Sequence, residues 1–308
     1  MELQYEVVIV GAGPAGLTAA IYATRANKKT LVLESNAPGG KLVKTYEIEN
    51  YPSVRKSSGV DLAMSLMEHG LAFGAEFDNT GVIKIEKNDG VFDITLTNNK
   101  IIKSQTVIVA SGTRERTLPV KDSEKYTGRG ISYCAVCDGA FYKGKDVIVI
   151  GGGNSALEES LYLTSLVNKV NIVIRRDQFR AEASIVERVL NNEKINVIYN
   201  SVADSLLVEN DKVTGLKIKN VKDGSTSTVY GSAIFPYIGA DAATEYLPKD
   251  ILDENGYVIT NEEMETSLEG MYAAGDVRVK NLRQVVTATS DGAVSANSAV
   301  RYLKSKNK

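Results

Sequence analysis

The chain has 308 residues, of which 43% are hydrophobic and 24% charged, with a formal net charge of -2. These values predict a globular protein with a sizeable core, built as one large domain or as two or three ordinary ones. They argue against nucleic-acid binding, because phosphate contacts need a surplus of Lys and Arg on one face. Two cysteines and one histidine are too few for a disulfide-stapled secreted scaffold or a cysteine-rich zinc scaffold.

The first elements fall in an uncharged stretch, residues 7–24, which has about the length of a membrane span or of a signal core. The preceding MELQYE carries acid instead of a basic region, and the glycines within residues 11–16 would break a helix. We therefore expect a strand, a turn and a helix, with no membrane span and no export signal. A cytoplasmic location with thiols facing a reducing pool is the corresponding expectation.

An internal repeat organises the chain. Residues 7–17 (VVIVGAGPAGL) align without gaps on residues 147–157 (VIVIGGGNSAL), at an offset of 140. In each copy, four β-branched residues predict a buried strand, and a Gly-rich turn, a helix and a second apolar strand follow, at residues 30–34 and 170–174. The repeat predicts two βαβ nucleotide-binding units.

The second unit is expected to be inserted in the first, because apolar strands of the first kind resume at residues 267–276. Crossings between the units are predicted where Gly, Pro and charges cluster, at residues 111–120 and 237–248. Further strands are expected at 91–97 and 106–110, and helices at 60–73, 183–190 and 291–303, with a frayed tail at 304–308.

The first glycine turn has the spacing Gly11-x-Gly13-x-x-Gly16 between a strand and a helix, as dinucleotide binding requires. The positive end of that helix would face the phosphates. Glu34 ends the second strand, where its carboxylate could accept hydrogen bonds from a ribose diol. The competing interpretation is a glycine turn without a ligand.

The second turn reads Gly151-x-Gly153-x-x-Ala156, and Ile174 takes the place of the acid. Three arginines follow, which suits a 2′-phosphate and therefore NADP: Arg175, Arg176 and Arg180. A solvated basic turn is the alternative. FAD is the natural ligand of the first site, because two nicotinamides could only exchange like for like. Asp276, in Ala-Gly-Asp after a short apolar strand, is a weak further pointer to a ribityl chain.

Both cysteines lie in a C-x-x-C pair, Cys134 and Cys137, directly before Asp138. This spacing supports a disulfide that opens and closes with little backbone movement. Two inert thiols are the alternative, and zinc would need ligands that the chain hardly offers. Asp138 could donate protons if its site is of low dielectric, or could form an Asx-turn. His69 lies in an ordinary amphipathic helix, so no catalytic or metal role is expected for it.

Together these motifs resemble low-molecular-weight thioredoxin reductase over essentially the whole chain. The resemblance implies an α/β fold of two Rossmann-like three-layer domains, with the NADPH domain (114–242, carrying the redox disulfide) inserted in the FAD domain (1–113 and 243–308). It implies a homodimeric thioredoxin-disulfide reductase, and thioredoxin or a thioredoxin-like protein as partner. NADPH would reduce FAD, and FAD the Cys134–Cys137 disulfide.

The resemblance also implies site residues. The catalytic ones are Cys134, Cys137 and Asp138. The FAD-binding ones are Gly11, Gly13, Pro14, Ala15, Gly16, Glu34, Ser35, Gly39, Gly40, Lys41, Asn50, Val82, Ala110, Gly112, Gly275, Asp276, Arg283, Gln284 and Val285. The NADPH-binding ones are Gly151, Gly153, Asn154, Ser155, Ala156, Arg175, Arg176 and Arg180. No metal is expected.

Three positions depart from the family pattern. Ile174 replaces a histidine beside the arginines, Lys41 replaces a glutamine near the flavin, and residues 242–244 read Ala-Ala-Thr instead of Pro-Asn-Thr. The added charge of Lys41 is expected to favour reduced flavin. The nicotinamide and the disulfide must each reach the flavin, and the reduced thiols must also reach the partner. We therefore expect the inserted domain to rotate about the two crossings.

Other functions remain open from the residues. A reductase serving a peroxiredoxin would normally carry an extra domain with its own cysteines. A ferredoxin-dependent relative or a dithiol oxidase would lack the second glycine turn and its arginines. A non-enzymatic flavin or NADP sensor would not need Cys134 and Cys137.

Overall fold

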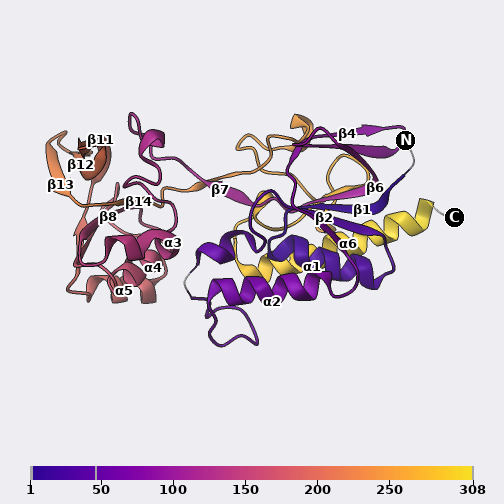
Figure 1. Cartoon of the computed structure of the whole chain (residues 1–308), viewed down its shortest axis with the longest axis horizontal. Coiled ribbons are helices and arrows are strands. Elements are labelled where there is room, and N and C mark those ends of the chain that lie inside the picture. Colours follow the sequence, from indigo (N-terminus) through magenta and orange to yellow (C-terminus); the bar gives the residue numbers. More distant parts are fainter. Residues whose placement is uncertain (1–2, 46, 307–308) are drawn as a thin grey trace. The chain divides into compact units, whose positions relative to one another are not determined.

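The computed structural model describes residues 3–45 and 47–306, and Figure 1 shows the course of the chain. The chain forms two compact units. Unit 1 comprises Met1–Arg114 and Asp241–Lys308, and unit 2 comprises Glu115–Ala240. Unit 1 is therefore discontinuous in sequence.

Unit 1 is built on one sheet. Its strands are β1 Tyr5–Val10, β2 Thr30–Leu33, β3 Glu76–Asp78, β4 Val82–Asn88, β5 Val91–Leu96, β6 Ile101–Val109 and β16 Met271–Ala273. The strands β3, β2, β1 and β6 run parallel in that order. Beyond β6, the antiparallel β5 pairs with its first half and the parallel β16 with its second half, while β4 extends the sheet from β5. The late strand β16 thus completes the sheet that β1 begins.

Helices cover this sheet. They are α1 Pro14–Arg25, α2 Gly59–Leu71 and α6 Val285–Lys306, with the short helices η1 Gly40–Lys44, η4 Lys249–Ile251 and η5 Gly275–Val277. Figure 1 shows α1, α2 and α6 together along the sheet. Alternate residues of β1 face two different cores, as the two-residue period of a strand requires. Val7 and Ile9 pack with α1 and α6, whereas Val8 and Val10 pack with β4, β5 and the segment around Tyr246.

Unit 2 repeats this plan with a parallel sheet. Its strands are β8 Asp146–Ile150, β9 Lys169–Val173, β10 Ile195–Ile198 and β14 Ile234–Pro236, in the order β10-β9-β8-β14. Val147 and Val149 face a core shared with the helices α4 Asn154–Leu163 and α5 Ala183–Leu190. Ile148 and Ile150 face the opposite core.

That opposite core is covered by a three-stranded antiparallel sheet of β11 Ser201–Glu209, β12 Lys212–Asn220 and β13 Thr226–Tyr230. Helices, parallel sheet and antiparallel sheet make unit 2 a three-layer structure. The remaining elements are α3 Ala135–Asp138, η2 Glu124–Tyr126 and η3 Gly139–Tyr142. The two connections between the units pair as a ribbon of β7 Thr113–Glu115 and β15 Ala240–Ala242.

The predicted α/β fold and the repeat are confirmed, since β1–α1–β2 and β8–α4–β9 occupy the repeated segments. The predicted bounds of the last helix were wrong. It begins at Val285, ahead of the predicted start at 291, and continues through Lys306, past the predicted end at 303. Residues 285–289 (VVTAT) are poor in strong helix formers, so local propensity did not reveal that packing on α1 makes them helical. The predicted fraying of the tail is wrong for residues 304–306, which are helical, and the remaining residues of that prediction, 307–308, lie outside the described residues.

No helix within the described ranges is long and apolar enough to span a membrane. The uncharged residues 7–24 belong to β1, the glycine turn and α1.

Candidate active site

The first glycine turn contains two kinds of glycine. Gly11 has a φ of +111°, and a Cβ there would stand 2.3 Å from the carbonyl oxygen of Ala110; a Cβ on Gly16 would stand 1.9 Å from that of Gly11. These two glycines are required by the packing of the chain itself. Gly13 has an ordinary φ of -80°, and no atom lies within 4 Å of an added Cβ. Its missing side chain therefore leaves open space at the start of α1.

The second turn repeats this arrangement. Gly151 has a φ of +145° and would meet the carbonyl oxygen of Tyr237 at 2.3 Å, whereas Gly153 has a φ of -99° and open space beyond it. At both turns the chain thus needs the first glycine and leaves room at the middle one. Room for close backbone approach at a helix N-terminus is what a dinucleotide pyrophosphate requires.

Other predicted FAD residues gather around the first turn. Glu34 follows β2, and its two carboxylate oxygens accept hydrogen bonds from the backbone N–H groups of Ala12 and Asn36, both at 2.9 Å. A Cβ on Gly275 would stand 2.9 Å from the Cβ of Ala15, which places the turn after β16 against the first turn of α1. Residues from three parts of the chain therefore meet at the start of α1.

The start of η1 also reaches the first turn. The N–H of Gly39 donates to the carbonyl of Ala12 at 2.7 Å. A Cβ on Gly40 would stand 3.4 Å from the Cα of Gly13. Lys41 follows these two glycines within η1.

Two further predicted FAD residues, Ser35 and Val82, lie near each other. Val82 is the first residue of β4 and follows Gly81, whose Cβ position would stand 3.2 Å from the Cβ of Ser35. Because Ser35 comes directly after Glu34, the start of β4 lies close to the segment that carries this carboxylate.

A third group of predicted FAD residues is joined across the sequence. The Asn50 amide donates to the side-chain oxygen of Gln284 at 3.0 Å, and Arg283 donates through Nε to the carbonyl of Asp276 at 3.3 Å. Burial raises the pKa of Asp276, and the positive charges of Lys41, Lys280 and Arg283 oppose that rise. The positive charge of Lys41 thus acts to lower the pKa of Asp276.

The remaining residues predicted to contact FAD belong to unit 1 as well. Ala110 follows β6, and its carbonyl borders Gly11. Gly112 has a φ of +66°, and its carbonyl accepts a hydrogen bond from the N–H of Ala243 at 3.0 Å, at the start of the crossing. Val285 is the first residue of α6 and packs against the small core around Leu42.

The predicted NADPH residues gather at the second turn, in unit 2. Arg175, Arg176 and Arg180 are exposed, and none of them has an ion-pair partner among the described residues. The Arg180 backbone N–H donates to the carbonyl of Gly152 at 2.8 Å, which fixes that arginine beside the glycine turn. Asn154 is engaged differently, because its amide exchanges two hydrogen bonds of 2.9 Å with Glu182.

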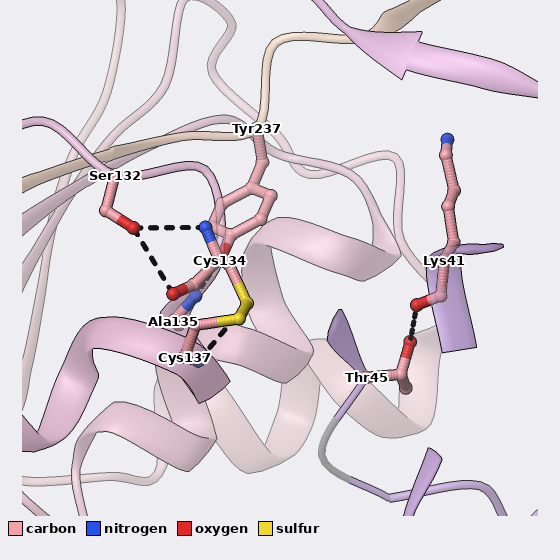
Figure 2. The surroundings of a disulfide bond; sticks show 7 residues. All are labelled: Lys41, Thr45, Ser132, Cys134, Ala135, Cys137 and Tyr237. Carbon is pink, nitrogen blue, oxygen red and sulfur yellow. Dashed lines mark hydrogen bonds between the residues drawn. A yellow bond between two sulfur atoms is a disulfide. The ribbon is translucent and has the colours of Figure 1, made fainter. Parts of the chain in front are cut away.

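The cysteine pair forms a disulfide, and side chains hold the backbone around it (Figure 2). Ser132 accepts from the N–H of Cys134 at 3.1 Å and donates to its carbonyl at 3.2 Å. The N–H of Cys137 donates to the Sγ of Cys134 at 3.1 Å. An N–H aimed at this sulfur stabilises negative charge on it once the disulfide opens. Cys134 is only 8% exposed, whereas Cys137 is exposed.

Tyr237 joins the disulfide to the second glycine turn. Its hydroxyl accepts the N–H of Ala135 at 3.1 Å, and its backbone carbonyl borders Gly151. Burial, together with the charge of Glu159, raises the pKa of Tyr237, so its hydroxyl remains protonated. Disulfide and second nucleotide turn are thus parts of one local structure within unit 2.

Asp138 ends α3 directly after Cys137 and makes no side-chain capping bond to η3, so the Asx-turn alternative is not what forms here. Burial, with a smaller contribution from the charge of Asp138, raises the pKa of Tyr142. The proton-donor role of Asp138 stays a prediction.

Four residues with a bearing on the site were not found from the sequence. Tyr237, Glu159 and Asp291 are revealed only by tertiary contacts, and no sequence motif marks them. Phe141 could have been noticed, because it is a large aromatic residue four positions after the second cysteine; its side chain is 75% exposed. No cluster of three or more His, Cys, Asp or Glu that could hold a metal occurs in the described ranges.

Two dinucleotide-type turns and a C-x-x-C disulfide beside the second define a nucleotide-dependent disulfide oxidoreductase. A family model described as pyridine nucleotide-disulphide oxidoreductase matches residues 5–292. The chain belongs to this family.

Individual relatives agree with that assignment. A thioredoxin reductase of Listeria monocytogenes is 44% identical over 98% of this chain and 95% of the relative, and one of Bacillus subtilis is 42% identical over 98% and 96%. The crystal structure of Lactococcus lactis thioredoxin reductase in its FR conformation matches with a TM-score of 0.95 and 40% identity, covering 98% of this chain and 100% of that one.

Proposed function

We propose that the chain is a thioredoxin reductase, an NADPH-dependent flavoprotein that reduces the disulfide of thioredoxin through FAD and the Cys134–Cys137 disulfide. The observation that carries this proposal is the disulfide held beside a dinucleotide turn, in a chain with a second such turn. Relatives that match over nearly the whole chain are named thioredoxin reductases. A non-enzymatic flavin or NADP sensor would not need the disulfide.

FAD fits the residues around the first turn. The open space at Gly13 would admit its pyrophosphate, Glu34 would accept from a ribose, and Asp276 would face the ribityl chain. When bound, FAD would supply the redox chemistry that links the two, by accepting a hydride from NADPH and passing two electrons on to the disulfide. The contribution of the chain is to bind and orient it, and the full set of FAD residues implied by the resemblance is part of this proposal.

NADPH fits the second turn. The open space at Gly153 would admit the pyrophosphate, and the exposed Arg175, Arg176 and Arg180 offer guanidinium groups for the 2′-phosphate. Ferredoxin as the electron source is not favoured, because it would leave this turn and its arginines unused. The same residues are a reason to prefer NADPH to NADH.

The disulfide chemistry is assigned to Cys134, Cys137 and Asp138. Two electrons and two protons convert the disulfide into two thiols. One thiolate attacks the partner disulfide, forms a mixed disulfide and releases the other partner sulfur as a thiolate that takes up a proton. The second cysteine, as a thiolate, then attacks the mixed disulfide, so that the Cys134–Cys137 bond re-forms and the partner leaves as a dithiol. Asp138 would deliver or remove the proton at the sulfur, and the exposed Phe141 would offer the partner an apolar contact beside it.

The units receive separate tasks in this proposal: unit 1 binds FAD, and unit 2 binds NADPH and carries the disulfide. Rotation of unit 2 about the two crossings would let nicotinamide and disulfide reach the flavin in turn. Homodimer formation and a cytoplasmic location are further proposals that rest on the family resemblance. Sedimentation of the purified protein tests the dimer.

The experiment is NADPH-driven reduction of a panel of purified disulfide proteins, including thioredoxin, a thioredoxin-like protein and a peroxiredoxin. We expect fast NADPH oxidation with thioredoxin, slow oxidation with NADH, and none with Cys137→Ser. A protein that holds FAD yet reduces only another partner would show that the thioredoxin assignment is wrong.

A further inference from the structure

A buried carboxylate on α6 binds the segment that follows β16. The side chain of Asp291 is only 10% exposed, and one of its oxygens, Oδ2, accepts three donors. These are the backbone N–H of Gly275 at 3.0 Å, the guanidinium of Arg278 at 3.0 Å and the ammonium of Lys280 at 2.7 Å. No motif of the sequence singled out this residue.

Both cations of this cluster are as buried as the carboxylate, since the side chains of Arg278 and Lys280 are each 11% exposed. Buried charges are stable in a protein only when they are paired and hydrogen-bonded. Asp291 is the carboxylate that pairs with both cations. If Asp291 lost its charge, the buried side chains of Arg278 and Lys280 would lose this ion-pair partner at a site with little access to water.

The segment that Asp291 holds contains proposed FAD residues. Gly275 has a φ of +77° and lies against Ala15 of α1, and Asp276 follows it directly. Arg283 donates to the carbonyl groups of Asp276 and Arg278, both at 3.3 Å. Lys280 also acts on Asp276 by its charge. Asp291 therefore holds the residue directly before Asp276, and Arg283 holds the carbonyl of Asp276 itself.

We propose that Asp291 is a positioning residue of the flavin site, which holds residues 275–280 in the conformation that FAD meets. The inference rests on the proposed function, because it takes FAD as the ligand of unit 1. Asp291 itself acts through Gly275, Arg278 and Lys280. Pre-ordering of a binding segment raises affinity because the ligand does not have to order it.

The test compares FAD binding by apoproteins from which the flavin has been removed. Asp291→Asn keeps the shape and an acceptor oxygen but removes the charge. We expect it to weaken FAD binding at least tenfold, measured by quenching of flavin fluorescence at a temperature where every apoprotein is folded, and to change the visible circular dichroism of bound flavin. Glu263→Gln is the matched control, because it breaks an exposed ion pair with Arg301 of the same helix; its affinity should stay within twofold.

Three outcomes are decisive. An Asp291→Asn apoprotein that unfolds at a lower temperature but binds FAD with unchanged affinity and dichroism would overturn the inference. If Asp291→Asn does not fold, Lys280→Met takes its place, since it removes one donor without leaving a carboxylate unpaired. It should then weaken FAD binding about threefold, and unchanged binding would overturn the inference. Failure of the wild-type apoprotein to bind FAD would instead overturn the proposed function.

Discussion

The two cysteines differ in their surroundings although they form one bond. Cys134 is buried and receives the N–H of Cys137 at its sulfur, whereas Cys137 is exposed. A thiol that attacks a protein disulfide must be reachable by the partner, and the thiol that stays behind benefits from a stabilised thiolate. The geometry favours Cys137 as the attacking thiol.

This difference can be tested by trapping. A thioredoxin with one redox cysteine, activated as a mixed disulfide with an aromatic thiol, should be captured by Cys134→Ser, in which Cys137 displaces the aromatic thiolate. Cys137→Ser should react at least tenfold more slowly. Release of the coloured thiol gives the rates, and equal rates would show that exposure does not select the attacking sulfur.

Glu159 is a buried carboxyl on α4, with 9% exposure and an oxygen, Oε2, that has no hydrogen-bond partner among the described residues. Burial, with a smaller contribution from the charge of Glu158, raises its pKa from 4.5 to about 8. In the unfolded chain the group ionises near its ordinary value. Its contribution to stability is therefore fully present at low pH and is lost as the pH rises toward 8, by up to about 1.4 kcal/mol per pH unit.

Glu159→Gln removes this titration without changing the shape. We expect the unfolding temperature of the variant to be higher than that of the wild type at pH 8 and to depend less on pH between 5 and 8, as measured by calorimetry. Glu263→Gln serves as the control, because Arg301 lowers the pKa of Glu263. That carboxyl is therefore ionised in both the folded and the unfolded chain between pH 5 and 8, and its removal should leave the pH dependence in this range as in the wild type. Identical pH profiles for Glu159→Gln and wild type would contradict the buried-acid assignment.

At the scale of elements, the two strand–turn–helix units use glycine in the same way. Gly13 and Gly153 have ordinary φ values, and no atom lies within 4 Å of a Cβ added at either position. The protein without ligands can therefore accommodate an alanine at either position. A methyl group there would occupy the room proposed for a pyrophosphate. The two positions therefore form a matched pair of probes.

Gly13→Ala should weaken FAD binding at least tenfold and leave the NADPH affinity of the remaining holoprotein unchanged. Gly153→Ala should raise the KM for NADPH at least tenfold with normal FAD content. Neither should lower the unfolding temperature of the apoprotein by more than about 2 °C. Flavin content and steady-state kinetics measure both effects, and equal losses of the two ligands in either variant would contradict the assignment of sites.

The sequence predicts some elements of this fold and misses others. The repeat predicts β1–α1–β2 and β8–α4–β9 because buried parallel strands and glycine turns leave strong local patterns. The sheet of β11, β12 and β13 was not predicted, since its half-buried strands lack such a pattern. Tyr237 and Asp291 act through partners more than ten residues away, so no local pattern reveals them.

At the scale of the whole molecule, the two units are joined by the crossings that carry β7 and β15. In the proposed reaction, the disulfide and the nicotinamide of NADPH both belong to unit 2, and each must reach the flavin of unit 1. One fixed arrangement of the two units cannot serve both steps. A verified covalent crosslink between the units should abolish turnover with NADPH and thioredoxin, while a crosslink confined to unit 1 should leave turnover intact. Full activity of the protein with the inter-unit crosslink would contradict the proposed rotation.

In the proposed reaction, electrons pass from NADPH through FAD to the Cys134–Cys137 disulfide. Anaerobic titration with NADPH, followed by bleaching of the flavin absorbance, tests this relay most directly. We expect the wild type to take two equivalents or more of NADPH per flavin, because the disulfide accepts one pair of electrons, and Cys134→Ser to take one. If a single equivalent of NADPH bleached the flavin completely in the wild type and in Cys134→Ser alike, the disulfide would not accept electrons from the flavin, and the relay would be wrong.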